Sequence, residues 1–373
     1  MIWLLVLIVL VAFVLELVSL KRSAIRLTYR LEPSVRSVEQ GEEFKLRTTV
    51  DNATGYNIPY LMLEELIPDG VEFLDEETLH LIPDGNHTVH QSVIFVKKRQ
   101  RVRRSVRVCI NQRGMFKFRR ATLKIGDFLG LKSTEKMVEF SNSVVVYPKR
   151  LEDEKLNSVL SDIFGEISVQ SFLFEDPILV RGYLDYTGRE PLRSISSPMS
   201  ARRNQLTVKE YDHTREEVVD ILFDISYKGD FDHYFIQLET MFSMVRTICE
   251  NFEQRGISYR LITNAYYSSM DVRGVNVIQS GGSGGSSFTK ILEILGIASR
   301  AAMCDTDELL RHAFLRFSQE KSFLYVSQRR EEETEQKLKR LEQGYGVSLH
   351  RVYGEDYEEA FLENEKREEK IEC

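Results

Sequence analysis

The strongest constraint on the fold is an apolar segment at the N-terminus, Met1–Leu20, which carries a single charged residue, Glu16. A helix of this length is about 30 Å long, which matches the hydrocarbon core of a bilayer. Basic residues follow the segment, at Lys21 and Arg22, and none precedes it as in a secretory signal peptide. The segment therefore predicts a transmembrane helix at residues 1–20.

The basic residues next to this segment also predict an orientation. Lys21, Arg22, Arg26 and Arg30 all lie on its C-terminal side. An excess of Lys and Arg marks the cytoplasmic flank of a membrane span. We therefore expect a single-pass protein of the cell membrane, with its C-terminal domains in the cytoplasm and the lipid bilayer contacted through residues 1–20.

The composition of the whole chain limits the classes of protein to consider. Of its 373 residues, 42% are hydrophobic and 29% are charged, which suits folded domains. The net charge of −7 gives no reason to expect binding to nucleic acid. The four cysteines form no CxxC pair, which argues against a disulfide framework. We therefore expect folded domains with free thiols and no nucleic-acid partner.

Residues 21–148 have the pattern of an all-β domain. The stretch Phe44–Val50 alternates between buried-type and polar side chains, as on a strand with one buried face. Similar runs recur between turn residues, which predicts an Ig-like β-sandwich that serves as a spacer or an interaction surface. His80, His87 and His90 match no metal-site spacing, so we interpret them as scattered surface histidines.

An α/β pattern follows a connector at 149–215. Val218–Phe223 is almost continuously apolar, as expected of a parallel strand that is covered on both faces. Strands and helices then alternate, which predicts a doubly wound, mostly parallel sheet at 216–353. Helices are expected at 231–255, 288–300, 306–319 and 331–343, and further strands at 257–264, 271–279, 322–327 and 347–353. The acidic residues from 354 onward read as a solvated tail.

Several segments resemble a family of bacterial proteins. The connector contains Arg193-x-Ile195, Ser200-Ala201-Arg202 and Leu206-x-Val208-Lys209-x-Tyr211-Asp212. These residues resemble the signature of the bacterial domain-of-unknown-function family numbered fifty-eight. The family's "RGxY", "DPFGL" and "VxVYP" segments have similar counterparts, in the same order, at 113–116, 126–131 and 144–148. Those proteins are von Willebrand factor A-like and often encoded beside MoxR-type AAA+ ATPases. The resemblance covers about 20–330, although Ser197 and Gly188-Arg189-Glu190 replace the family's tryptophan and "GDD".

The fold class that follows is α/β plus all-β, in five parts. They are a transmembrane anchor at 1–20, a β-sandwich at 21–148, a connector with the family signature at 149–215, a von Willebrand A-like α/β domain at 216–353 and an acidic tail at 354–373.

The resemblance also implies a metal-ion-dependent adhesion site after the strand at 218–223. In von Willebrand A domains a DxSxS motif, a threonine and an acidic residue hold Mg²⁺, which prefers hard oxygen ligands. Here Asp224 and Ser226 are followed by Lys228, which places a cation where the metal would bind. One carboxyl group provides too little negative charge, so the site is degenerate. We expect no metal cofactor; if Mg²⁺ bound, Asp224 and Ser226 would hold it.

Open α/β sheets bind ligands at the carboxyl ends of their strands. The candidates for a partner-binding crevice there, together with the Arg-rich segment 181–203, are Asp224, Ser226, Ser286, Ser287, Arg181, Arg193 and Arg202. The glycine-rich loop before Ser286 is no P-loop, because Lys290 follows a threonine and not a glycine. The chain contains no GxSxG or HExxH motif, so we expect no enzyme.

The leading hypothesis is a membrane-tethered, cytoplasm-facing protein-interaction module. The resemblance implies a MoxR-type AAA+ ATPase as its partner in the assembly or remodelling of protein complexes, with other membrane or envelope proteins as further partners. The alternative is a metal-dependent adhesion domain that binds a partner's carboxylate through Mg²⁺ at Asp224 and Ser226. A nucleotide-binding or hydrolytic enzyme that uses the loop at 281–290 is the third hypothesis.

Overall fold

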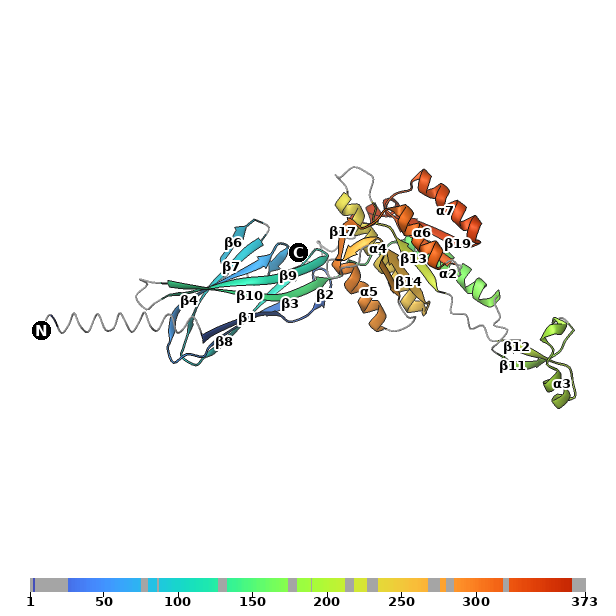
Figure 1. Cartoon of the computed structure of the whole chain (residues 1–373), viewed down its shortest axis with the longest axis horizontal. Helices are drawn as coiled ribbons and strands as arrows, with labels where there is room; N and C mark the ends of the chain where they lie inside the picture. The colour runs from blue at the N-terminus through green and yellow to red at the C-terminus, as the bar shows by residue number, and fades with distance from the viewer. Residues whose placement is uncertain are drawn as a thin grey trace. The chain divides into compact units, whose positions relative to one another are not determined.

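The computed structural model describes two compact units, each with a hydrophobic core of its own (Figure 1). Unit 1 comprises 1–149 with 293–297, and unit 2 comprises 150–292 with 298–373. The described residues are Trp3, 26–74, 80–85, 87–126, 133–173, 180–188, 190–211, 218–226, 234–267, 276–279, 285–317 and 322–363.

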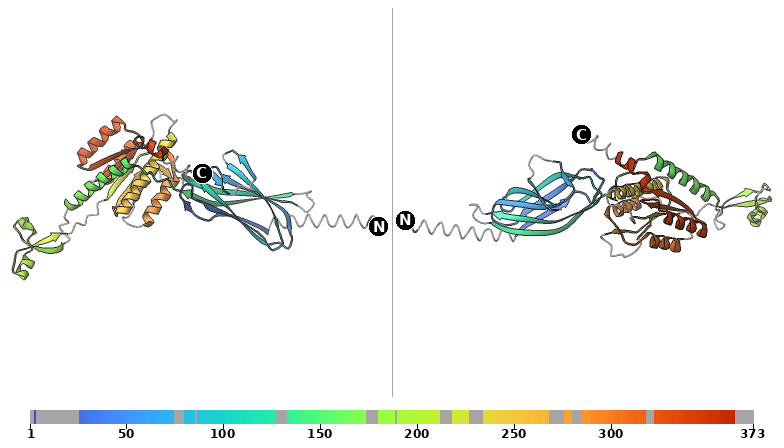
Figure 2. Two further views of the ribbon diagram at one scale, coloured as in Figure 1. Left: turned by 180° about the vertical axis from the view of Figure 1, so that it is seen from behind. Right: turned by 90° about the horizontal axis from the view of Figure 1, so that it is seen from above.

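Unit 1 is built from two sheets that enclose one core, as the sequence predicts for a β-sandwich (Figure 2). The four-stranded sheet has the order β1 (Leu27–Pro33), β3 (Phe44–Asn52), β8 (Arg101–Ile110) and β5 (Val71–Phe73). The six-stranded sheet has the order β2 (Ser37–Val38), β10 (Ser133–Val146), β9 (Gly114–Gly126), β4 (Ile58–Pro68), β7 (His87–Val96) and β6 (His80–Asp84). Alternate residues of strands such as β3 and β4 face the core, because successive side chains of a strand point to opposite faces.

A buried polar cluster joins the two sheets inside this core. Glu65 of β4 is 3% exposed and accepts hydrogen bonds of 2.6 Å from the hydroxyls of Tyr29 and Thr48. His90 of β7 lies 2.8 Å from its other carboxylate oxygen. Burial by itself raises the pKa of Glu65, but the hydrogen bond and charge of His90, with the two hydroxyls, bring the pKa below its ordinary value. His90 is therefore a core residue, and its interpretation as a surface histidine is wrong.

Removal of the Glu65 carboxylate tests this cluster. We expect Glu65→Gln to lower the free energy of unfolding by about 2–4 kcal/mol at neutral pH, because buried polar partners lose a charged acceptor. Because the pKa of Glu65 is lowered in the folded state, its carboxylate stabilises the fold fully at pH values above the ordinary pKa of a carboxyl group. This stabilisation is lost as the pH falls through the folded-state pKa. Urea unfolding followed by circular dichroism should therefore show that the difference in unfolding free energy between Glu65→Gln and wild type becomes smaller as the pH is lowered.

Glu64 provides the matched control for this change. It precedes Glu65 on the same strand but points to the outer face, where it pairs with Lys124 at 2.8 Å. Such a pair contributes about 0–1 kcal/mol, so Glu64→Gln should cost little. If Glu65→Gln and Glu64→Gln lowered the free energy of unfolding equally, the buried cluster around Glu65 would not have the stabilising role proposed for it.

The predicted membrane anchor, residues 1–20, lies outside the described residues apart from Trp3. Within the described part of the chain, no helix is both long enough and apolar enough to cross a membrane. The longest described helices, α2 (Glu154–Leu173) and α4 (Tyr234–Arg255), carry charged residues along their length, and each would cost roughly 2.5–3.5 kcal/mol at a bilayer centre. The described residues therefore do not support the predictions of a transmembrane helix and of a single-pass membrane protein with cytoplasmic C-terminal domains.

The main sheet of unit 2 has five strands. Their order is β16 (Asn276–Gln279), β14 (Tyr259–Thr263), β13 (Val219–Phe223), β18 (Ser322–Ser327) and β19 (Ser348–Tyr353). Strand β13 is parallel to both β14 and β18, and β18 is parallel to β19, whereas β16 is antiparallel to β14. Two further antiparallel pairs are β11 (Val180–Asp185) with β12 (Thr207–Tyr211) and β15 (Ala265–Tyr267) with β17 (Ala298–Ala302).

The prediction of a von Willebrand A-like, doubly wound sheet is therefore wrong, although three of the four strand pairings in the main sheet of unit 2 are parallel. The sheets of the described residues are mixed or antiparallel. A parallel connection needs a crossover, usually a helix, before the chain can pair again in the same direction. Between β14 and β16 the described residues contain only the short strand β15, and the chain returns antiparallel. Alternation of predicted elements does not reveal this reversal, because it carries no information on strand direction.

Helices pack against the main sheet of unit 2 from two directions. Leu222 and Tyr325 belong to a core cluster with residues of α6 (Thr306–Phe317) and α7 (Glu332–Tyr345). Phe223, the next residue along β13, instead contacts Phe242 of α4, with ring centroids 5.0 Å apart. Because neighbouring strand residues point to opposite faces, α4 lies on the other side of the sheet from α6 and α7. The carboxyl ends of the strands therefore lie between α4 on one face of the sheet and α6 and α7 on the other.

One charged residue lies inside the apolar strand β13. The Asp220 carboxylate accepts hydrogen bonds of 2.6 and 2.8 Å from the guanidinium of Arg260, which is directly opposite on β14. Asp220 is fully buried and Arg260 nearly so. A bidentate pair of this kind satisfies both charges, so it allows an aspartate within a buried strand.

Candidate functional site

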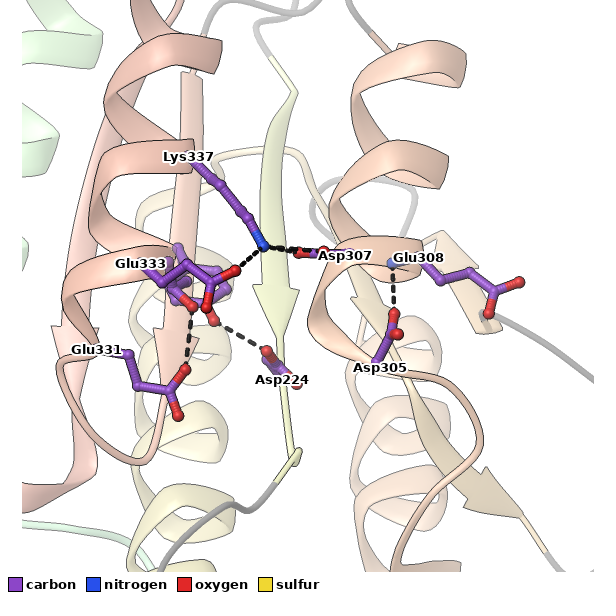
Figure 3. A network of polar contacts seen from close by, with 9 residues as sticks. Asp224, Asp305, Asp307, Glu308, Glu331, Glu333 and Lys337 are labelled. Carbon is purple, nitrogen blue, oxygen red and sulfur yellow. Dashed lines mark hydrogen bonds and ion pairs between the residues drawn. The ribbon is translucent and has the colours of Figure 1, made fainter.

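A cavity of about 230 Å³ lies at the carboxyl ends of β13 and β18. Figure 3 shows Asp224, the residue after β13, between the first turns of α6 and α7. The lining is polar and consists of Asp224, Ser226, Thr306, Tyr325, Ser327, Gln328, Arg329, Arg330, Glu331 and Thr334. The site therefore has the position of a ligand crevice, but it is smaller than the usual range of about 300–1,000 Å³ and its lining is mostly polar.

Asp224 forms the floor of this cavity and is almost fully buried. One carboxyl oxygen accepts hydrogen bonds from the Ser226 backbone N–H, at 2.9 Å, and from the Asn264 amide, at 2.7 Å. The other oxygen accepts a hydrogen bond of 2.9 Å from the Tyr325 hydroxyl. Burial, and then the charge of Asp224, raise the pKa of Tyr325 well above its ordinary value, so this hydroxyl remains a donor. The carboxyl group is thus satisfied by its own protein.

The side-chain amide of Asn264 is the centre of this arrangement. Its nitrogen lies 2.7 Å from the Asp224 carboxyl, 2.8 Å from the Ser226 hydroxyl and 3.1 Å from the Cys304 carbonyl oxygen. The Ile225 backbone N–H donates to the amide oxygen at 2.9 Å, which fixes the orientation of the amide. A fully buried N–H₂ group therefore points at three oxygens from two segments of the chain, 224–226 and the loop at Cys304.

This geometry does not fit a magnesium ion. Mg²⁺ requires several hard oxygen ligands in an octahedron, usually with carboxylates among them. Here an N–H donor lies between the oxygens of Asp224 and Ser226, and two electropositive groups cannot share that position. Among the described residues there is also no cluster of three or more His, Cys, Asp or Glu side chains arranged to hold a metal. We derive no metal chemistry at this site.

The site also lacks an activated nucleophile among its described side chains. Burial raises the pKa of the Cys304 thiol to about 11, with further contributions from Glu308, Asp224 and Asp305. A thiol with this pKa is protonated at neutral pH and reacts poorly, because the thiolate is the nucleophile. The groups around Asp224 are suited to hydrogen bonding and not to proton transfer.

Acidic side chains surround the mouth of the cavity. Asp305, Asp307 and Glu308 belong to the start of α6, and Glu331 and Glu333 to the start of α7 (Figure 3). The Asp305 carboxylate accepts a hydrogen bond of 2.8 Å from the Glu308 backbone N–H and so caps its helix. Lys337 pairs with Asp307 and Glu333 at 2.8 and 2.7 Å. Acids at helix N-termini stabilise the helix, and they also make this rim attractive to cations.

The predicted site residues are only partly brought together. Asp224 and Ser226 line the cavity. Arg193 lies on the short helix η2 (Leu192–Ser194) and Arg202 on α3 (Ser197–Arg203), and neither belongs to the cavity lining. The Arg181 side chain on β11 lies outside the described residues, as do the side chains of two residues of α5 (Gly285–Ile297), Ser286 and Ser287.

Sequence reasoning missed the residues that define the site. Asn264 and Tyr325 were read only as parts of strands, and Thr306 and Thr334 as parts of helices. A signal existed for Asn264, because an asparagine directly after a buried strand lies at the same sheet edge as Asp224. Tyr325 gave no such signal, since a tyrosine within an apolar strand usually indicates core packing.

Comparisons with known proteins add no assignment. No protein-family model and no curated protein matches the chain. Solved structures with partial likeness include the CARDB domain of a Pyrococcus furiosus protein, at 14% identity over 32% of this chain and 93% of that chain, with a TM-score of 0.21. Others are a human PapD-like domain, at 13% identity over 32% and 84%, TM-score 0.21, and a Clostridium perfringens cohesin module, at 10% identity over 32% and 96%, TM-score 0.24. Likeness at this level assigns neither a family nor a function.

Substitution of Asn264 tests the reading of the site. Asn264→Asp replaces the N–H donor by a carboxyl oxygen close to the carboxyl of Asp224, so we expect the free energy of unfolding to fall by about 2–4 kcal/mol at neutral pH. Added Mn²⁺ or Mg²⁺ should raise the melting temperature of this variant, because a cation then relieves the repulsion. Wild type should show no shift with either ion.

A second asparagine serves as the control. Asn251 also donates its amide to a carbonyl oxygen, that of Thr247, at 2.9 Å within α4. Asn251→Asp should show no cation-dependent shift in melting temperature. A shift of equal size for wild type and Asn264→Asp would contradict the conclusion that the amide takes the place of a cation.

Proposed function

We propose that this protein is a non-enzymatic interaction protein that binds a protein partner at the cavity between α6 and α7. The observation that carries the proposal is the internal saturation of Asp224, which accepts three hydrogen bonds from its own protein. A carboxyl group held in this way is poorly placed for acid–base catalysis or metal binding. The lining also includes exposed polar side chains, Arg329 among them, that can form hydrogen bonds with a bound polypeptide.

Charge favours a cationic segment of the partner. The rim carries Asp305, Asp307, Glu308, Glu331 and Glu333, and the basic Lys337, Arg329 and Arg330 balance only part of this charge. Residues 150–373 contain 28 basic and 40 acidic residues, a net charge of −12. Complementary charge speeds encounter and rejects like-charged partners.

The resemblance of the connector to family fifty-eight supplies a candidate partner. It implies a MoxR-type AAA+ ATPase, and we propose that the two proteins act together in the assembly or remodelling of protein complexes. The metal-dependent alternative loses support from the position of the Asn264 amide. The nucleotide hypothesis depends on the loop at 281–290, most of which lies outside the described residues.

Direct binding tests the proposed function. Purified full-length chain should bind the MoxR-type ATPase of the same organism in biolayer interferometry, without added metal and with an affinity that decreases as salt increases. Absence of association at low salt would refute the proposal. Binding that requires Mg²⁺ held by this protein would also refute it.

One rim residue and a matched control locate the binding surface. Glu308 is in the first turn of α6 at the rim, and Glu154 is in the first turn of α2. Both changes, Glu308→Lys and Glu154→Lys, reverse one charge and lose the same interaction with a helix dipole. We expect Glu308→Lys to weaken binding by about three- to tenfold and Glu154→Lys to leave it within a factor of about two. Equal affinities for the two variants would exclude the rim as the contact surface.

A further inference from the structure

A second surface with different chemistry lies on the connector. The β11–β12 module comprises the described residues 180–188 and 190–211, with η2 and α3 between its two strands. Its described buried residues are Ser196, Thr207 and Val208, so the module has very little apolar core. A two-stranded hairpin by itself is marginally stable in water.

The module exposes leucines that a small hairpin would ordinarily bury. Leu184 is 54% exposed, Leu206 is 53% exposed and Leu192 of η2 is 74% exposed. Leu184 lies opposite Val208 in the strand register, and Leu206 lies two residues before Val208. Side chains two apart on a strand share a face, so Leu184, Leu206 and Val208 form one apolar face of the hairpin. Several exposed leucines on so short a segment are typical of a binding surface.

The charge of the module is opposite to that of the chain that follows it. Residues 180–211 contain six basic and three acidic residues, a net charge of +3 within a unit that is strongly acidic. Arg193 and Arg202 are exposed, and no acidic partner is found for either among the described residues. Arg203 is held within the module by the Tyr183 carbonyl oxygen at 3.2 Å. Arg193 and Arg202 are thus available to acids of another molecule.

We infer that the β11–β12 module is a docking surface for an acidic, leucine-rich segment of another protein. Charge complementarity favours acidic residues opposite Arg193 and Arg202, and the exposed leucines favour apolar side chains between them. Single-stranded nucleic acid fits less well, because leucines offer no flat aromatic face on which bases stack. This surface is separate from the acidic rim around Asp224 and binds a partner of opposite charge.

A designed peptide tests the inference independently of the ATPase. The probe is a fluorescein-labelled amphipathic peptide with glutamates on one face and leucines on the other, and the readout is fluorescence anisotropy with the full-length chain. Wild type should bind the peptide in a salt-dependent manner. The double variant Arg193→Glu/Arg202→Glu and the single variant Leu192→Ser should each weaken binding by at least about fivefold, since they remove the charge or the apolar contact.

The control is a charge reversal of the same size elsewhere in unit 2. Lys339 and Arg340 are exposed on α7, and Lys339→Glu/Arg340→Glu should bind the peptide as wild type does. Circular dichroism verifies that all variants are folded. The inference is overturned if wild type does not bind the peptide or if the α7 variant loses peptide binding to the same extent. It is also overturned if the module variants lose binding to anionic lipid vesicles while their binding to the peptide is unchanged. Sedimentation that shows self-association abolished by the module variants would identify a second copy as the occupant and overturn it too.

Discussion

The arrangement at the carboxyl edge of unit 2 depends on the side-chain amide of Asn264. The amide connects the residues that follow β13 and β14 with the loop before α6, through contacts with Asp224, Ser226, Ile225 and the Cys304 carbonyl. Asn264, Asp224 and Ile225 are buried, whereas Ser226 and Cys304 are partly buried, and an unsatisfied buried polar group costs about 1–3 kcal/mol. One residue thus fixes both the shape of the edge and its chemistry, because its N–H donors take the place that a cation would occupy.

Buried polar groups have the same role in both units. In unit 1, Glu65 connects β4 with β1, β3 and β7 through Tyr29, Thr48 and His90. In unit 2, Asp220 and Arg260 connect the central strands. A buried polar group without its partners is costly, so these contacts favour one pairing of the strands. The proposed binding cavity of unit 2 then lies at the edge of a sheet whose register these contacts stabilise.

Local pattern predicted the elements better than their assembly. Alternation at Phe44–Val50 predicted a strand with one buried face, and β3 has this pattern of burial. Periodicity predicted a helix at 306–319, and α6 covers Thr306–Phe317. The predicted direction of β16 was wrong, because the direction of this strand depends on the connection after β14 and not on the residues of the strand itself. Two of the ten residues that line the cavity, Asp224 and Ser226, could be identified from the sequence, whereas Tyr325 resembled an ordinary core residue.

The sequence by itself determined strands of the sandwich and the position of Asp224 and Ser226 at a strand end, because these follow from hydrophobic periodicity and from neighbours along the chain. Tertiary structure alone decided which groups surround Asp224. Asn264 lies 40 residues from Asp224 and Tyr325 lies 101 residues away. Contacts between residues so far apart arise only when strands pair, and strand pairing is set by packing and buried hydrogen bonds that no local pattern encodes.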